Sequence, residues 1–118
     1  MNEEEEYSYT GFENLETAQH LKDCEVCKVI GIGNSMTPIL KSRQPVICEP
    51  VTEDTVLEKK DIVLCKVNGH FYLHLIQAIK PAGKSQSYQI GNNHGHINGW
   101  VSRGQIYGKV TKILEVEK

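Results

Sequence analysis

The alternation of apolar and polar residues is the main pattern in this chain. From about residue 24 onward, short apolar and β-branched runs are separated by glycine, proline and asparagine, which is typical of strands and turns. The clearest case is an apolar run over 61–67, the pair Asn68–Gly69 and a second run over 70–79. Because Asn–Gly is the preferred pair for a two-residue type I′ turn, these residues predict a β-hairpin.

The same pattern predicts the other strands. They cover residues 24–30, 46–51, 88–90, 100–101 and 106–116. Pro45 and Pro50 bound the strand over 46–51, which favours a place at the edge of the sheet, because proline donates no ladder hydrogen bond. Residues 52–60 and 91–99 are predicted loops, and the second of them is rich in glycine and asparagine.

Within the strand over 70–79, side chains alternate between two faces. One face carries His70, Tyr72, His74 and Ile76, and the other carries Phe71, Leu73 and Leu75. His74 therefore lies in the middle of a strand, where a rigid sheet would fix the direction of its ring.

The N-terminal segment follows a different pattern. Residues 1–9 are acidic and polar and predict a flexible arm. Thr10 and Glu13 have the spacing of a capping box, and apolar residues recur at helical spacing over 11–22, which predicts a short amphipathic helix. The expected fold is one mostly β domain over 10–118, a compact twisted sheet or barrel with this helix at its start.

Length and charge narrow the classes of function. The 118 residues suit a single domain, and the formal net charge of −2 disfavours nucleic-acid binding, which uses a basic face. No run approaches the ~20 apolar residues that cross a bilayer. The acidic start lacks the positive charge of a signal peptide. We therefore expect a cytoplasmic protein with no integral membrane segment and no nucleic-acid partner.

Ser35 is a candidate nucleophile because it follows a glycine-rich corner that would expose its hydroxyl. A serine hydroxyl needs a base to remove its proton, and imidazole serves near neutral pH, so His74 is the candidate base. Backbone amides around Gly33 and Met36 are candidate oxyanion donors. In the alternative interpretation, Ser35 caps a short helix over 36–40 and His74 is an ordinary half-buried side chain.

Cysteine and histidine pairs raise the question of a metal site. Cys24 and Cys27, with His20 before them, have a spacing that zinc sites use, but a second cysteine pair is missing. The His94–Gly95–His96 stretch is more typical of an exposed turn. We expect reduced cysteines, with Cys48 and Cys65 in the core, and neither a metal nor a cofactor.

Several stretches resemble the conserved boxes of one superfamily, in the same order along the chain. Gly33–Asn34–Ser35–Met36–Thr37–Pro38–Ile39–Leu40 resembles the nucleophile box of signal-peptidase and LexA-like serine peptidases. Lys60–Asp61–Ile62–Val63–Leu64 is similar to the Gly-Asp-Ile-Val strand, and Phe71–Tyr72–Leu73–His74–Leu75–Ile76 to the strand that carries the base. Gly91–Asn92–Asn93 and Gly108–Lys109–Val110 are similar to the two downstream boxes.

Histidine rather than lysine at position 74 makes the chain most similar to the endoplasmic-reticulum and archaeal type. In that type an aspartate orients the base, whereas here Asn92 and Asn98 stand at the matching places. An amide orients an imidazole but does not stabilise imidazolium as a carboxylate does. The resemblance implies a structural role for Asp61.

The resemblance implies a small soluble serine endopeptidase that acts on a polypeptide, with Ser35 as nucleophile and His74 as base. A phage or mobile element would suit such a short member of the superfamily. Because the expected aspartate is missing, the alternative is a catalytically silent relative that binds a peptide or a partner protein. A metal-binding module built on Cys24 and Cys27 is a third interpretation.

Overall fold

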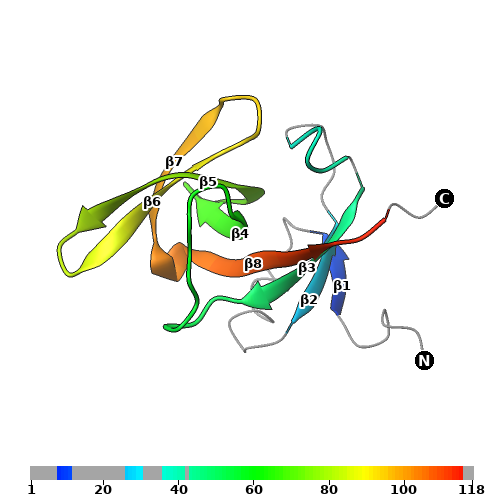
Figure 1. The fold of residues 1–118 in the computed structure, drawn as a ribbon, viewed down its shortest axis with the longest axis horizontal. Coiled ribbons are helices and arrows are strands. Elements are labelled where there is room, and N and C mark those ends of the chain that lie inside the picture. Colours follow the sequence, from blue (N-terminus) through cyan, green and yellow to red (C-terminus); the bar gives the residue numbers. More distant parts are fainter. Residues whose placement is uncertain (1–7, 12–25, 31–35, 42, 116–118) are drawn as a thin grey trace.

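The computed structural model describes residues 8–11, 26–30, 36–41 and 43–115. These residues form one eight-stranded β-sheet with the strand order β1-β2-β3-β8-β4-β5-β6-β7 (Figure 1). The elements are β1 Ser8–Gly11, β2 Cys27–Ile30, β3 Pro45–Pro50, β4 Ile62–Val67, β5 His70–Ala82, β6 Ser85–Gly91, β7 Ile97–Ser102, the 3₁₀ turn η2 Arg103–Gln105, and β8 Ile106–Ile113. The β1–β2 pair is parallel and the other pairs are antiparallel. The predicted mostly β fold is confirmed.

Two hydrophobic clusters fill the two sides of the sheet, and β4 contributes to both. Ile62 and Leu64 belong to the first cluster, while Val63, Cys65 and Val67 belong to the second. A strand buried on both faces needs apolar residues at successive positions, which explains the nearly continuous apolar run of β4.

The hairpin predicted around Asn68–Gly69 is confirmed. Val67 of β4 lies opposite His70 of β5, and the two turn residues have φ angles of 50° and 85°. Positive φ at both central positions is the geometry that favours the Asn–Gly pair. The predicted alternation along β5 also holds, since Leu73 and Leu75 pack in the first cluster and Ile76 in the second.

Strand β5 changes partner along its length, and this places His74 at a junction. Residues 70–75 pair with β4, and residues 75–82 pair with β6. A register shift between Ile76 and Ala78 interrupts the second ladder. Figure 1 shows the result, with β5, β6 and β7 extending to one side of the β4 and β8 strands.

The prediction that the strand over 46–51 lies at an edge is wrong. Strand β3 lies inside the sheet between β2 and β8. Pro45 is its first residue and Pro50 its last, so the missing N–H groups fall at the two ends of the strand. The residues over 46–48 pair with both neighbouring strands.

Other predicted boundaries also differ. Residues 36–40 form a single turn, closed by a hydrogen bond from Leu40 N to Met36 O at 2.9 Å, where a short helix was predicted. The Thr37–Pro38 peptide bond within this turn is cis. Ser8 and Tyr9, predicted as the end of the acidic arm, begin β1. Apart from Gly11, which ends β1, the helix predicted over 11–22 falls outside the described residues.

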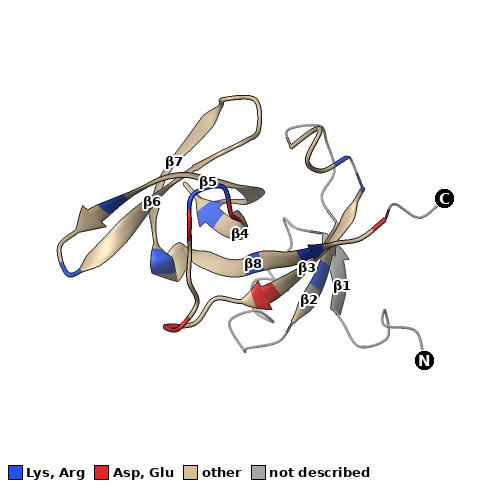
Figure 2. Ribbon diagram, viewed as in Figure 1, with Lys and Arg blue, Asp and Glu red and all other residues tan. Residues whose placement is uncertain are grey.

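Charged residues of both signs are distributed along the described part of the chain (Figure 2). Figure 2 shows lysine and arginine on several strands and loops, with aspartate and glutamate between them. Among the described residues, no helix is long and apolar enough to cross a membrane.

Candidate functional site

His74 is held inside the sheet at the junction of β5. Its side chain is 7% exposed, and its Cα lies opposite Val63 of β4. The ring of Tyr72, two residues earlier on the same face, stacks on the imidazole with centroids 5.0 Å apart and planes 26° apart. The strand and the stacked ring together fix the orientation of the imidazole.

Asn98 of β7 binds the imidazole of His74. Its Oδ1 atom lies 2.7 Å from His74 Nδ1. Because an amide oxygen only accepts, the imidazole carries its proton on Nδ1 and donates it. The neutral ring then has its lone pair on Nε2, which is the form that a general base needs.

A β-bulge directs Asn98 toward β5. In the β6–β7 ladder, Gly91 lies opposite Ile97 and Ile90 opposite Gly99, which leaves Asn98 between them without a Cα partner. Such an extra residue turns side chains and is common beside active sites. Gly99 has a φ of +149°, a conformation that L side chains rarely adopt, and an added Cβ would lie 3.2 Å from Val67 Cγ1.

Burial lowers the pKa of His74 below its usual range. The hydrogen bond with Asn98 acts in the opposite direction, and the nearby His96 lowers the pKa further. Desolvation disfavours the charged form of a buried histidine. The ring is therefore mostly neutral at pH 7, and a proton acceptor is available without a change of pH.

Asn92, the other candidate to orient the base, holds its own loop instead. Its Oδ1 accepts hydrogen bonds from the backbone amides of His94 at 2.8 Å and His96 at 3.0 Å. Its backbone N donates to His96 O at 2.9 Å. Of the two asparagines, the structure brings Asn98 to His74 and assigns Asn92 to the 92–96 loop.

Gly91 allows this loop to fold tightly against β5. An added Cβ would lie 2.6 Å from His96 O and 3.0 Å from both Gln77 Cγ and Ile97 Cδ1. The Gln77 side chain also donates to Asn92 O at 2.8 Å. A side chain at position 91 would displace the loop that leads into Asn98.

The turn that follows Ser35 is fastened to the same loop. Asn93 Nδ2 donates to Thr37 O at 2.9 Å, and His94 Nε2 lies 3.0 Å from Thr37 Oγ1. Met36 and Leu40 are buried in the first cluster, which also contains Leu73 and Leu75 on either side of His74. Ser35 and Gly33 lie outside the described residues.

Asp61 supports the loop before β4. Its Oδ2 accepts a hydrogen bond from Glu58 N at 2.8 Å and pairs with Lys109 Nζ at 3.3 Å. Both contacts are structural, and neither involves His74.

The cysteines and loop histidines give no metal site in the described part of the chain. No group of three or more metal-binding side chains occurs there. Cys48 and Cys65 are buried, and burial raises the pKa of Cys65 to about 12, so this thiol stays protonated and unreactive. Cys24 and the side chain of Cys27 lie outside the description.

Two contacts of the site were not predicted. The stacking of Tyr72 on His74 has a signal in the sequence, because period-two alternation puts both rings on one face. The bond from Asn93 to Thr37 joins residues 56 apart, and no local pattern indicates it. Trp100, in a predicted strand, is 40% exposed, and the Lys80 ammonium lies 4.2 Å from the centroid of its ring.

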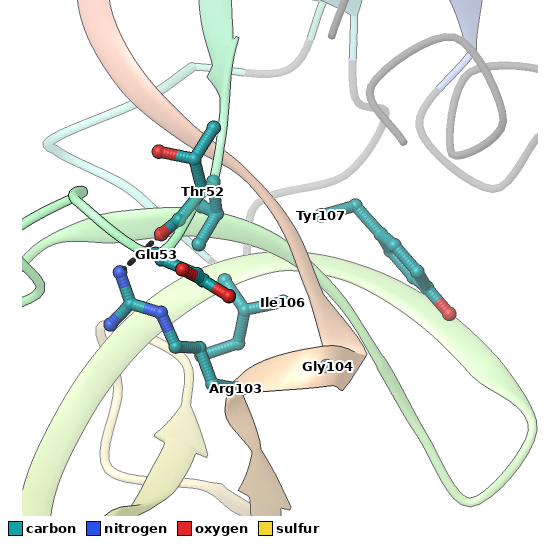
Figure 3. Close-up of a pocket in the computed structure, with 7 residues that line it drawn as sticks. Thr52, Glu53, Arg103, Gly104, Ile106 and Tyr107 are labelled. Carbon is teal, nitrogen blue, oxygen red and sulfur yellow. Dashed lines mark hydrogen bonds between the residues drawn. The ribbon is translucent and has the colours of Figure 1, made fainter. Parts of the chain in front are cut away.

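A separate surface pocket of about 420 Å³ lies between η2, β8 and the segment after β3 (Figure 3). It is lined by Val51, Thr52, Glu53, Arg103, Gly104, Ile106 and Tyr107. The Arg103 guanidinium donates to the carbonyl oxygens of Thr52, at 2.6 Å, and Thr55. These bonds hold the wall of the pocket together, and the pocket shares no residue with the His74 site.

No family model, curated protein or solved structure matches this chain. The resemblance to signal-peptidase and LexA-like enzymes therefore rests on the ordered sequence boxes alone. The contact that bears most directly on chemistry is the hydrogen bond between His74 and Asn98.

Proposed function

We propose that the chain is a small serine endopeptidase related to signal peptidases, with Ser35 as nucleophile and His74 as general base. The observation that carries the proposal is the 2.7 Å hydrogen bond from His74 Nδ1–H to Asn98 Oδ1. It holds a mostly neutral imidazole in the tautomer that accepts a proton at Nε2.

In the proposed reaction the Ser35 hydroxyl attacks a peptide carbonyl, and Nε2 of His74 takes the hydroxyl proton. The same nitrogen then returns the proton to the leaving amine, and water hydrolyses the acyl-enzyme by the reverse sequence. Backbone amides around Ser35, including those of Gly33 and Met36, would stabilise the oxyanion. Asn98 orients the imidazolium but adds no opposite charge, so the reaction is slow.

The proposed substrate is an extended polypeptide that adds to the edge of β5. Residues 70–74 pair with β4 on one side, and β6 pairs only from Leu75 onward. Within the described residues no strand of the sheet pairs with the other edge of 70–73, and this edge leads directly to His74. An extended peptide can complete such an edge through main-chain hydrogen bonds. The resemblance implies small side chains next to the cleaved bond.

Labelling with a fluorophosphonate probe tests this proposal. The wild type should be labelled, whereas Ser35→Ala and His74→Phe should not be. Ser85→Ala is the matched control, because Ser85 is an exposed serine at the start of β6. Equal labelling of the Ser35→Ala variant would disprove the role of Ser35.

The second candidate is a catalytically silent domain that binds a peptide on the same edge. Asn98 favours it, because a neutral amide stands where the histidine-type enzymes have an acid. Absence of labelling over a wide pH range, in a chain with intact β-sheet circular dichroism, would establish this candidate over the enzyme.

A further inference from the structure

Asn98 is followed by Gly99, and Asn–Gly is the dipeptide in which asparagine most readily loses ammonia. We propose that Asn98 is a site of self-modification: it deamidates to aspartate and so places a carboxylate on His74. The deamidation of Asn98 does not depend on the proposed function. Its effect on activity does, because that effect rests on His74 as the base of a serine peptidase.

The step needs only water. The backbone nitrogen of Gly99 loses its proton and attacks Cγ of Asn98, and the side-chain nitrogen leaves as ammonia, which gives a five-membered succinimide. Water then adds to Cγ, the bond from Cγ to the Gly99 nitrogen breaks, and the peptide N–H is restored. The balance is one asparagine side chain and one water in, and one aspartate carboxylate and one ammonium ion out.

Three features of the site favour this reaction at Asn98. The N–H donated by His74 Nδ1 at 2.7 Å polarises the amide carbonyl and would stabilise the oxyanion that forms at Oδ1. The bulge leaves Asn98 without a Cα partner in the ladder. The following residue must be glycine, because its φ is +149°, and glycine offers no Cβ to hinder the approach of its nitrogen to Cγ.

Asn98 is also half-buried rather than sealed in the core, so water reaches the succinimide. Hydrolysis at Cγ gives aspartate and keeps the main chain unchanged. Hydrolysis at the backbone carbonyl gives isoaspartate, which would lengthen the main chain of β7 by one carbon. The ladder on either side of the bulge opposes that change, since it fixes Ile97 against Gly91 and Gly99 against Ile90.

The product would change the chemistry of His74. A carboxylate at the position of Asn98 Oδ1 accepts the same Nδ1–H bond and adds the opposite charge that imidazolium needs. Replacing a triad aspartate by asparagine costs a serine protease about 10⁴ in rate, because the imidazole takes the wrong tautomer. His74 already carries its proton on Nδ1, so the modification would restore only the part of that factor that comes from the added charge. The chain as synthesised would then be a slow precursor of the modified enzyme.

A second Asn–Gly pair in the same chain provides an internal control. Asn68–Gly69 forms the exposed hairpin turn and lacks a histidine donor at its side chain in the described contacts. Folded protein is kept in mildly alkaline buffer, and peptide mapping by mass spectrometry follows both asparagines and separates aspartate from isoaspartate. The same measurement in urea gives the intrinsic rates of the two sites.

We compare the deamidation rate at Asn98 with that at Asn68, and we expect folding to raise this ratio about tenfold. One well-aligned hydrogen bond to the transition state has an effect of about this size. We expect aspartate as the main product at position 98. His74→Phe keeps a ring beside Tyr72 but removes the N–H, so it should abolish the rise. A ratio that folding leaves unchanged or lowers, or isoaspartate as the main product, would overturn the proposal.

Asn98→Asp, made directly, separates this inference from the proposed function. If fluorophosphonate labels Asn98→Asp at least tenfold faster than the freshly made wild type, and wild type gains this rate as Asn98 converts, both stand. If Asn98 converts but neither form is labelled, the modification stands and the peptidase fails. If Asn98→Asp is labelled and Asn98 does not convert, the peptidase stands and the inference fails.

Discussion

The ionisation of His74 ties the stability of the fold to pH. Burial lowers the pKa of His74 in the folded chain, whereas in the unfolded chain it is about 6.5. Above that value both states hold a neutral ring. As the pH falls from 6.5 toward the folded pKa, the unfolded state takes up the proton first, so this residue contributes to a loss of stability on acidification.

We therefore predict that the free energy of unfolding of the wild type falls more steeply between pH 6.5 and 5 than that of His74→Phe, which cannot take up the proton. Urea titrations at several pH values would measure both slopes. The two proteins differ only at this residue, so the difference in slope reports mainly on His74. Parallel slopes would mean that His74 is protonated to the same extent in both states.

Gly91 gives a second prediction at the residue level. Gly91→Ala adds a Cβ that would lie 2.6 Å from His96 O, so we expect a loss of about 1–3 kcal/mol in unfolding free energy. Gly104→Ala is the control, because its Cβ would meet only Ser102 Oγ at 3.9 Å. Thermal and urea unfolding would measure both. A loss no larger for Gly91→Ala than for Gly104→Ala would contradict the close packing of the loop.

The sequence predicts the placement of some residues of the site better than that of others. The direction of His74 follows from strand periodicity, which depends only on neighbouring residues. Asn98 was expected in a loop over 91–99, yet it lies on β7, and its contact with His74 depends on a bulge. A bulge is set by the pairing of β6 with β7. The resemblance to the histidine-type enzymes therefore suggested Asn98, but the local pattern did not place it on a strand.

At the scale of elements, Arg103 joins parts of the chain that no strand pairing connects. Its guanidinium, on η2, donates to carbonyls of the loop between β3 and β4 and, at 3.5 Å, to Tyr88 OH of β6. We predict that Arg103→Met lowers the unfolding free energy by about 1 kcal/mol, because the carbonyl groups of exposed Thr52 and half-buried Thr55 lose a charged donor. Equilibrium urea unfolding would measure the loss.

The control for Arg103→Met is Lys84→Met, which removes a cation from the exposed turn between β5 and β6. We expect a change within about 0.5 kcal/mol for this variant. Amide exchange adds a local measurement, since the loop over 51–57 should exchange faster in Arg103→Met and not in Lys84→Met. Equal exchange in the two variants would mean that Arg103 does not hold the loop.

Features that depend on neighbouring residues, such as a hairpin, were predicted better than features that depend on distant residues, such as the place of a strand in the sheet. The β4–β5 hairpin follows from an Asn–Gly turn between two apolar runs, and all three parts are local. The place of β3 does not follow from Pro45 and Pro50, because a proline at the end of a strand is compatible with an interior place as well as an edge. Strand order is decided by distant pairings.

For the whole molecule, β4 links the two hydrophobic clusters. Alternate residues of one strand belong to different clusters, for example Leu64 to the first and Val63 to the second, and both are fully buried. The turn after Ser35 packs on the first cluster, while Ile90 beside the β6–β7 bulge packs in the second. Strand β4 therefore connects the cluster under the turn after Ser35 with the cluster beside the β6–β7 bulge.

This arrangement predicts a single cooperative unfolding transition. Leu64→Ala and Val63→Ala remove buried methyl groups from different clusters, and each should lower the unfolding free energy, Leu64→Ala by about 2–5 kcal/mol. Exposed Val56, at 64% exposure, is the control, and Val56→Ala should change little. Trp100 fluorescence reports on β7, and circular dichroism reports on the whole sheet. Because β4 contributes residues to both clusters, the two probes should give coincident transitions in every variant. Transitions that separate in Leu64→Ala would show that the clusters unfold independently.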